Sequence, residues 1–190
     1  MNSKKIEIEV PNGKKPEWVN GVLTLVDEEP VDVDERIKTF EDACNELGKH
    51  HSFVLQYTAI NDSLLPGEEQ AKDVIAYLKL RIIVAALNEG WEPQFTEDEY
   101  RWYPWFALWT EEELSNKSDE WKADRHLIST GYYSGDNAGF SYSSSDFAPS
   151  RTYTYVGSRL CLKSEALATY CGKQFIDIWA DYVLLRCLPF

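Results

Sequence analysis

WEPQFTEDEYRWYPWFALW, from Trp91 to Trp109, is the stretch on which the packing of this chain depends, because eight of its nineteen residues are aromatic. Pro93 and Pro104 prevent it from forming one continuous helix. β-Branched residues, which favour strands, are almost absent from it. The stretch therefore predicts loops and short turns that wrap the end of the preceding helix. We expect most of its rings to lie between helices, as core packing rather than as a ligand platform.

Two long segments with helical periodicity flank this stretch. Glu68 to Glu89 carries apolar residues on much of its circumference and is followed by Gly90, which predicts a central helix. Glu165 to Leu185 follows a capping signal at Ser164 and has one wide apolar stripe. Gly172, in the middle of this second helix, predicts either a close approach of another backbone or a split in the helix.

The first third of the chain predicts strands followed by a helix. Ile6 to Val10 alternates apolar and charged residues, as a half-buried strand does. Trp18 to Val26 predicts a second strand, in which Asn20-Gly21 is either a tight hairpin turn or a bulge. Asp34 to Leu47 has helical spacing and ends before Gly48, and Ser52 to Ile60 predicts a strand or an irregular buried segment.

The segments after the aromatic stretch predict shorter elements. Thr110 followed by Glu113 forms a capping box, which predicts a short helix from Glu111 to Asn116. Leu127 to Tyr133 predicts a strand, and Ser134 to Ser150 predicts ordered loops and short strands rather than a plain linker. Tyr153 to Leu162 predicts one or two further strands.

Together these elements predict an α+β fold. We expect one domain over residues 1–190, with a β-rich N-terminal segment at 1–33 and a main body at 34–190. The two main helices, at about 68–89 and 165–185, should pack on a small, mostly antiparallel sheet.

The net charge of the chain disfavours some classes of binding partner. A formal net charge of −13 argues against general affinity for nucleic acid and for anionic membrane surfaces, because the field of the molecule repels both. The acidic residues are densest between Glu92 and Asp124. This segment is either a solvated face or a surface that mimics nucleic acid or docks a basic partner. The start MNSKKIEIEV has no apolar run of signal-peptide length, so we expect no signal peptide, and we expect no membrane span because no segment has the necessary length and apolarity.

The sequence contains no signature of catalysis. It has no Gly-rich phosphate loop, HExxH helix, GxSxG elbow or EF-hand loop. The spacing of its four cysteines predicts reduced, mostly buried thiols. An enzyme would require His126 to meet Cys161 or Cys171 together with a carboxylate, so we expect no enzymatic activity, no cofactor and no metal site. His50 and His51 are expected in a loop.

The candidate binding residues are aromatic side chains beside prolines or in Gly/Ser-rich loops. Loops supply variable surface while helices supply rigid support. The candidates are Trp102, Trp105, Trp109, Tyr132, Tyr133 and Tyr142.

Three runs of the sequence carry a resemblance to a known family: ERIKTFEDACNELG, AYLKLRIIVAALNEGWEPQFTEDEYRWYPWF and YVGSRLCLKSEALATYCGKQFIDIWADYV. They resemble uncharacterised proteins of tailed phages of gut Bacteroidales, including crAss-like phages, and of their prophages. The resemblance implies a phage protein, in the virion or the host cytoplasm.

A second resemblance concerns residues 128–163, where a Ser-Thr-Gly sequence, a Gly/Ser/Asn-rich loop and Gly157-Ser158-Arg159-Leu160-Cys161 follow in order. This order is similar to the end of C-type-lectin-like domains, in which the loops before the last strand bind surfaces. Arg159 is expected to reach a carboxylate from the end of that strand.

Three functional hypotheses follow from these observations. The first is a non-enzymatic phage-associated protein, either a virion component or a module that binds a surface or ligand, with a protein partner or virion neighbour and a possible homo-oligomer. The second is an intracellular acidic phage protein that binds and inhibits a host or defence factor. The third is an enzyme of unknown class.

Overall fold

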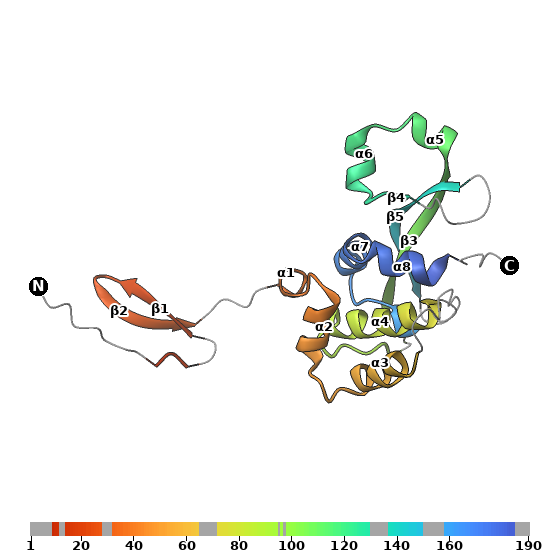
Figure 1. Ribbon diagram of the computed structural model, residues 1–190. Coiled ribbons are helices and arrows are strands. Elements are labelled where there is room, and N and C mark those ends of the chain that lie inside the picture. The colour runs from red at the N-terminus through yellow and green to blue at the C-terminus, as the bar shows by residue number, and fades with distance from the viewer. Residues whose placement is uncertain are drawn as a thin grey trace, which may run out of the picture. The chain divides into compact units, whose positions relative to one another are not determined.

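The computed structural model describes residues 9–11, 14–27, 32–64, 72–94, 96, 98–129, 137–149 and 158–184. The chain divides into two compact units, Met1–Asp32 and Val33–Phe190. Figure 1 labels the elements of both units.

The first unit contains an antiparallel hairpin of β1 (Lys14–Val19) and β2 (Val22–Asp27). Asn20 and Gly21 join the strands with φ of 50° and 80°. Two consecutive left-handed residues give the turn whose twist matches that of paired strands. Asn20-Gly21 is therefore a hairpin turn and not a bulge. The strand expected at Ile6 to Val10 falls mostly outside the described residues, and residues 9–11 have no regular structure.

The second unit begins with two short helices, α1 (Val33–Arg36) and α2 (Phe40–Leu47). The single helix expected from Asp34 to Leu47 is therefore wrong. Thr39 causes the break, because it takes extended backbone angles and accepts a hydrogen bond from the Asp42 amide, while the Asp42 carboxylate accepts one from the Thr39 amide. This reciprocal capping box starts a new helix at the next residue.

The next element, α3 (Ser52–Ser63), replaces the strand or irregular segment expected at Ser52 to Ile60. A short apolar run does not distinguish a strand from a buried helix by its periodicity. The feature that decides is His51, whose Nδ1 accepts a hydrogen bond from the Phe53 amide at 3.3 Å and so caps the helix.

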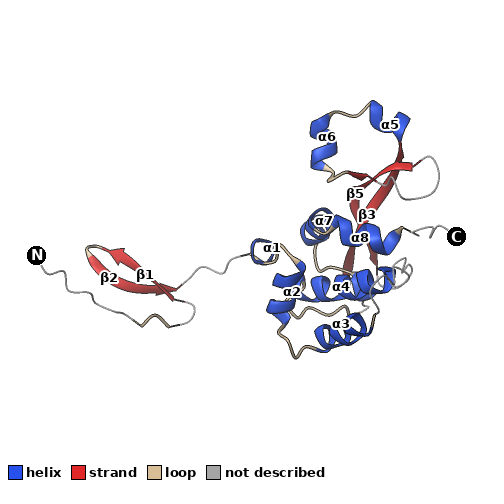
Figure 2. Ribbon diagram, in the orientation of Figure 1, coloured by secondary structure: helices blue, strands red, loops and turns tan. Residues whose placement is uncertain are grey.

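Helix α4 (Lys72–Leu87) is the centre of the second unit, as its sequence predicts. It packs against α2 and α3 and also against α8 (Ile176–Val183). Figure 2 shows α4 between these groups of helices. Its buried side chains are Ala76, Leu78, Leu80, Ile82, Ile83, Val84, Ala86 and Leu87. The expected start of this helix, residues 68–71, lies outside the described part of the chain.

The aromatic stretch forms a long strand, which contradicts the expectation of loops and short turns. β3 (Tyr100–Thr110) pairs antiparallel with β5 (Asn137–Pro149), and β4 (Ile128–Ser129) pairs with the other edge of β5. Pro104 is tolerated because β3 is an edge strand. Its nitrogen points in the same direction as the Trp102 amide, away from β5, so no hydrogen bond of the β3–β5 ladder is lost.

The segment Ser134 to Ser150 also differs from its prediction. Its described residues, 137–149, form one long strand instead of the expected loops and short strands. Of the strand expected at Leu127 to Tyr133, the described part is β4. The expected strand at Tyr153 to Leu162 is a 3₁₀ turn, η2 (Ser158–Leu160), within its described part. An isolated bridge from Leu162 to Trp102 follows this turn. The short helix predicted at Glu111 is confirmed as α5 (Glu111–Ser115), with Thr110 and Glu113 in a capping box.

The remaining helices are α6 (Asp119–Asp124), α7 (Glu165–Gln174) and α8. The helix expected from Glu165 to Leu185 is interrupted at Phe175, where φ is −112° and ψ is 30°. Helix α7 lies on β3 and β5, and its Gly172 faces Pro104 and Tyr142 of these two strands. A Cβ at Gly172 would lie 2.6 Å from Cβ of Pro104. Neither alternative holds as stated, because the atoms that come close belong to side chains of the sheet and the helix is interrupted at Phe175 rather than at Gly172.

The fold class is α+β, with the two main helical segments packed on a small antiparallel sheet, as predicted. One continuous core joins α4, α7 and α8 to the inner face of the sheet through residues such as Phe140, Leu162 and Trp179. Within the described ranges, no helix combines the length and apolarity needed to cross a membrane.

Candidate binding surface

The edge of β3 is held in place by the C-terminal end of α4. The Asn88 side chain is 5% exposed, donates to the Cys161 carbonyl at 2.9 Å and accepts from the Lys163 amide at 3.0 Å. The residue between these two, Leu162, exchanges two backbone hydrogen bonds with Trp102, at 2.9 and 3.0 Å. One buried amide therefore fixes the short segment that pairs with the edge strand.

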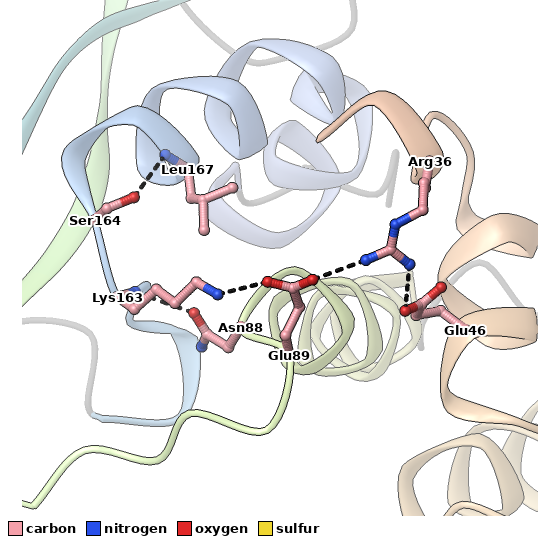
Figure 3. A network of polar contacts seen from close by, with 7 residues as sticks. All are labelled: Arg36, Glu46, Asn88, Glu89, Lys163, Ser164 and Leu167. Carbon is pink, nitrogen blue, oxygen red and sulfur yellow. Dashed lines mark hydrogen bonds and ion pairs between the residues drawn. The ribbon is translucent and has the colours of Figure 1, made fainter. Parts of the chain in front are cut away.

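Beside Asn88 lies a row of charged side chains that runs from Lys163 through Glu89 to Arg36 and Glu46, as Figure 3 shows. The Glu89 carboxylate accepts hydrogen bonds from Lys163 Nζ at 2.7 Å and from Arg36 Nη2 at 2.8 Å, and Arg36 also pairs with Glu46. The hydrogen bond from Lys163, with further help from Arg36, holds the pKa of Glu89 below its usual value. The Glu89 carboxylate has two cationic partners, and its side chain is 42% exposed. This network therefore joins α1, α2 and the segment before α7 to the end of α4 at the protein surface.

An aromatic cluster lies at the end of the sheet where Leu162 pairs with Trp102. The Tyr100 and Phe147 rings meet edge to face with centroids 4.5 Å apart, and the Trp102 ring lies 5.2 Å from Phe147. Tyr100 is 54% exposed, Phe147 is 43% exposed and Trp102 is half-buried. We call Tyr100, Trp102 and Phe147 the aromatic cluster. It presents flat apolar faces with one phenol and one indole polar group, a composition typical of interface anchors.

The geometry of the two strands explains why these rings come together. Trp102 and Phe147 are cross-strand partners, and Tyr100, two residues before Trp102, lies on the same face because side chains alternate along a strand. This is also the face of Pro104, which α7 covers. The cluster therefore extends the core face of the sheet into solvent.

Of the tryptophans expected at the surface, only Trp105 is largely exposed, at 44%. Alternation places Trp105 on the face of β3 opposite to the aromatic cluster. Trp109 is half-buried: its indole N–H donates to Ser141 Oγ at 2.8 Å, and its ring meets that of Trp121 edge to face at 5.1 Å. Lys117 Nζ lies 5.3 Å from the Trp109 ring. These contacts fasten α5 and α6 to the sheet and give Trp109 a structural role.

The expectation that Tyr142 lies on an exposed loop is wrong, because Tyr142 is on β5 and is 7% exposed. Its hydroxyl shares hydrogen bonds of 3.0 Å with Ser145 Oγ and with Thr169 Oγ1, and these two hydroxyls are 3.1 Å apart. Three mutually bonded hydroxyls join β5 to α7. Tyr132 and Tyr133 lie outside the described residues.

The outer side of α7 carries an open hollow of about 700 Å³, lined by His126, Glu165, Ala166, Thr169, Tyr170, Lys173 and Gln174. Several of its polar groups already hold the fold together. Tyr170 donates to the Ile37 carbonyl at 2.6 Å, Gln174 donates to the Lys38 carbonyl at 2.7 Å, and Lys173 pairs with Asp124 at 2.9 Å. Because these polar groups already bind other parts of the chain, the hollow is a weaker candidate for a binding site than the aromatic cluster.

The thiols in the described ranges are poorly suited to nucleophilic chemistry. Cys161 and Cys171 are buried, whereas His126 is exposed in a turn. Burial raises the pKa of Cys161 to about 11 and that of Cys171 to about 12, so both thiols are protonated at neutral pH. No group of three His, Cys, Asp or Glu side chains in the described part of the chain is placed to hold a metal ion.

Comparison with known proteins adds no relative, because no protein-family model, no curated protein and no solved structure matches the chain. The candidate site therefore rests on the geometry of these side chains.

Two members of the aromatic cluster, Tyr100 and Phe147, were missed from the sequence. A weak signal for Tyr100 was present, since Tyr100 and Trp102 flank the charged Arg101 as apolar residues do in a strand. Phe147 carried no such signal. Only the β3–β5 register places it opposite Trp102.

Proposed function

We propose that the protein is a non-enzymatic, phage-associated binding module that acts as a virion component or as a module contacting a surface ligand. The observation that carries the proposal is the exposed aromatic cluster of Tyr100, Trp102 and Phe147. Rings that are solvent-exposed on one side and supported by a rigid sheet on the other lose little conformational freedom on binding. The proposed contact is therefore a preformed surface.

The charge of the chain indicates which protein partner suits this surface. The net charge is −13, and exposed Asp98 lies two residues before Tyr100. A partner with an apolar pocket rimmed by Lys and Arg complements such a surface, and rim charges of opposite sign speed the encounter. A protein partner, in particular a virion neighbour with a basic rim, is the proposed occupant.

The proposal is tested with a double variant, Tyr100→Ser with Phe147→Ser, compared with Trp105→Ser. Trp105 is exposed to a similar extent but lies on the opposite face of the same strand. Tagged chains are expressed during infection and their co-purifying proteins are quantified. We expect the double variant to lose its partner, the Trp105 variant to retain it, and both variants to melt close to the unchanged protein.

Two outcomes contradict the proposal. Equal recovery of the same partners by the double variant and the unchanged chain excludes the aromatic cluster as a contact. A large loss of stability in the double variant assigns these rings to the core instead. Mass spectrometry of purified phage particles separates a packaged component from one that stays in the host cell.

A second function is supported by the acidic side chains of α5 and α6. Glu111, Glu112, Asp119 and Glu120 are all exposed on these two helices. This distribution suits an intracellular protein that binds and inhibits a basic host or defence factor. Recovery of a host protein by the chain, together with its absence from purified particles, favours this alternative.

A further inference from the structure

The N-terminal hairpin exposes apolar side chains that a two-stranded sheet cannot cover. Trp18 is 71% exposed and Val22 is 64% exposed. Cross-strand pairing places Pro16, Trp18, Leu23 and Leu25 on one face. A hairpin of two strands is marginally stable in water, and three or more strands with an apolar face are needed for independent stability. Within the described part of the first unit, the hairpin has no third strand on either edge.

The two edges of the hairpin are not equivalent. A two-residue turn makes Val19 and Val22 a hydrogen-bonded pair. The backbone nitrogen and carbonyl groups of Pro16 and Trp18 on β1, and those of Leu23 and Leu25 on β2, therefore point outward. On β1, Pro16 has no N–H to offer an added strand, and proline and lysine are residues that protect sheet edges. On β2, residues 22–26 contain neither proline nor charge.

The outer edge of β2 is thus competent to accept another strand. No strand within the described ranges pairs with it. The sequence of this edge also indicates what the additional strand is.

Residues 22–26 have the palindromic sequence Val-Leu-Thr-Leu-Val. If two copies pair antiparallel about Thr24, each residue lies opposite one of its own type. Val22 faces Val26, Leu23 faces Leu25, and Thr24 faces Thr24 of the second copy. The direction of the amides agrees with this register, because Leu23 and Leu25 are the residues whose N–H and C=O groups point outward.

We propose that the hairpin is a dimerisation element, in which β2 of two copies pairs antiparallel about Thr24 to form a four-stranded sheet. Leu23 and Leu25 of each copy exchange four backbone hydrogen bonds across the two-fold axis. The apolar faces of both hairpins then lie on the same side of the sheet, where each leucine gains the other copy's leucine as a neighbour. Pro16 ends the sheet on both outer edges.

This interface is smaller than the roughly 1,600 Å² of a standard protein complex, because it consists of one short strand from each copy. We therefore expect a weak dimer that dissociates on dilution. The proposal does not depend on the aromatic cluster, since all of its residues belong to the hairpin.

The first test is sedimentation of the full chain over a range of concentrations, with Thr24→Lys and Glu17→Gln as matched variants. Both substitutions add one positive unit of charge on the same face. Thr24→Lys opposes Glu17 within the hairpin, which preserves the hairpin, but it places two lysines face to face across the axis. We expect the unchanged chain and the Glu17→Gln variant to dimerise. The dissociation constant of the Thr24→Lys dimer should be at least roughly fivefold higher than that of the unchanged chain.

The second test traps the dimer covalently. Thr24 pairs lie at a non-hydrogen-bonded position, where Cα atoms are about 4.5 Å apart, which suits a disulfide. Under mild oxidation, Thr24→Cys should form a covalent dimer, whereas Glu17→Cys and the unchanged chain should not.

Three results overturn the proposal. One is an unchanged chain that is monomeric at every concentration, as would occur if a segment of the same chain covered β2. Another is equal dimerisation of Thr24→Lys and Glu17→Gln. The third is crosslinking of Thr24→Cys no faster than that of Glu17→Cys.

Discussion

A few buried side chains should make the stability of this protein decrease at alkaline pH. Cys171 is fully buried between α7 and the core, and this burial raises the pKa of its thiol to about 12. Burial also raises the pKa of Cys161 to about 11 and that of Tyr103 to about 12. In each case the native state retains a proton that the unfolded chain releases earlier.

The stability of the protein should therefore fall as the pH rises above 9.0, the ordinary pKa of a cysteine thiol. Between that pH and the folded pKa values, the unfolded state binds fewer protons than the native state, so the free energy of unfolding decreases with pH. The slope approaches about 1.4 kcal/mol per pH unit for each thiol. Urea unfolding between pH 7 and 11 measures it.

Cys171→Ala is the matched control for this pH dependence. It removes one titrating thiol from the interior, so its stability should fall less steeply above pH 9 than that of the unchanged chain. Identical slopes in the two proteins would show that Cys171 does not titrate on unfolding and would contradict its assigned role.

At the scale of elements, the contact between α7 and β3 depends on one glycine. Gly172 faces Pro104, and a Cβ at this position would lie 2.6 Å from the proline Cβ. It would also lie 2.9 Å from Cδ2 of Tyr142. The proline ring is tied to the backbone of the strand, so it cannot rotate away as a flexible side chain could.

Gly172→Ala should destabilise the protein despite the higher helix propensity of alanine. The propensity gain is about 1 kcal/mol, whereas forcing a methyl group into a packed interface costs about 1–3 kcal/mol. We expect a lower melting temperature. Exposed Ala166→Gly, in the same helix, measures the propensity contribution alone. A more stable Gly172→Ala variant would mean that α7 can shift away from the sheet.

At the scale of the whole molecule, charge opposes compactness. The chain carries 32 acidic against 19 basic residues, for a net charge of −13. Self-repulsion of this size destabilises a compact state, and salt screens it over about 10 Å at 0.1 M.

The melting temperature at pH 7 should accordingly rise with sodium chloride, by roughly a few degrees between low and physiological ionic strength. Calorimetry at several salt concentrations measures this shift. The same series near pH 4.6, where the net charge is close to zero, should show little salt dependence. A melting temperature that falls with salt at pH 7 would mean that ion pairs such as Glu89–Lys163 outweigh the repulsion.

The sequence by itself determined the features that arise from local chemistry. These are the central helix and the capping box that starts α5, together with the choice of a hairpin turn or a bulge at Asn20-Gly21, and each depends on residues within a few positions of one another. Their physical signals are side-chain periodicity, tolerance of positive φ and hydrogen bonds to free amides.

Only the tertiary structure decided what the aromatic stretch becomes. Its composition argues against a strand, yet β3 forms because β5 supplies its ladder and α7 covers its inner face. The same long-range pairing buries Tyr142 and brings Phe147, forty-seven positions away, onto Tyr100. Partners distant in sequence contribute nothing to local periodicity, so the side chains that form the candidate surface became apparent only when the strands were paired.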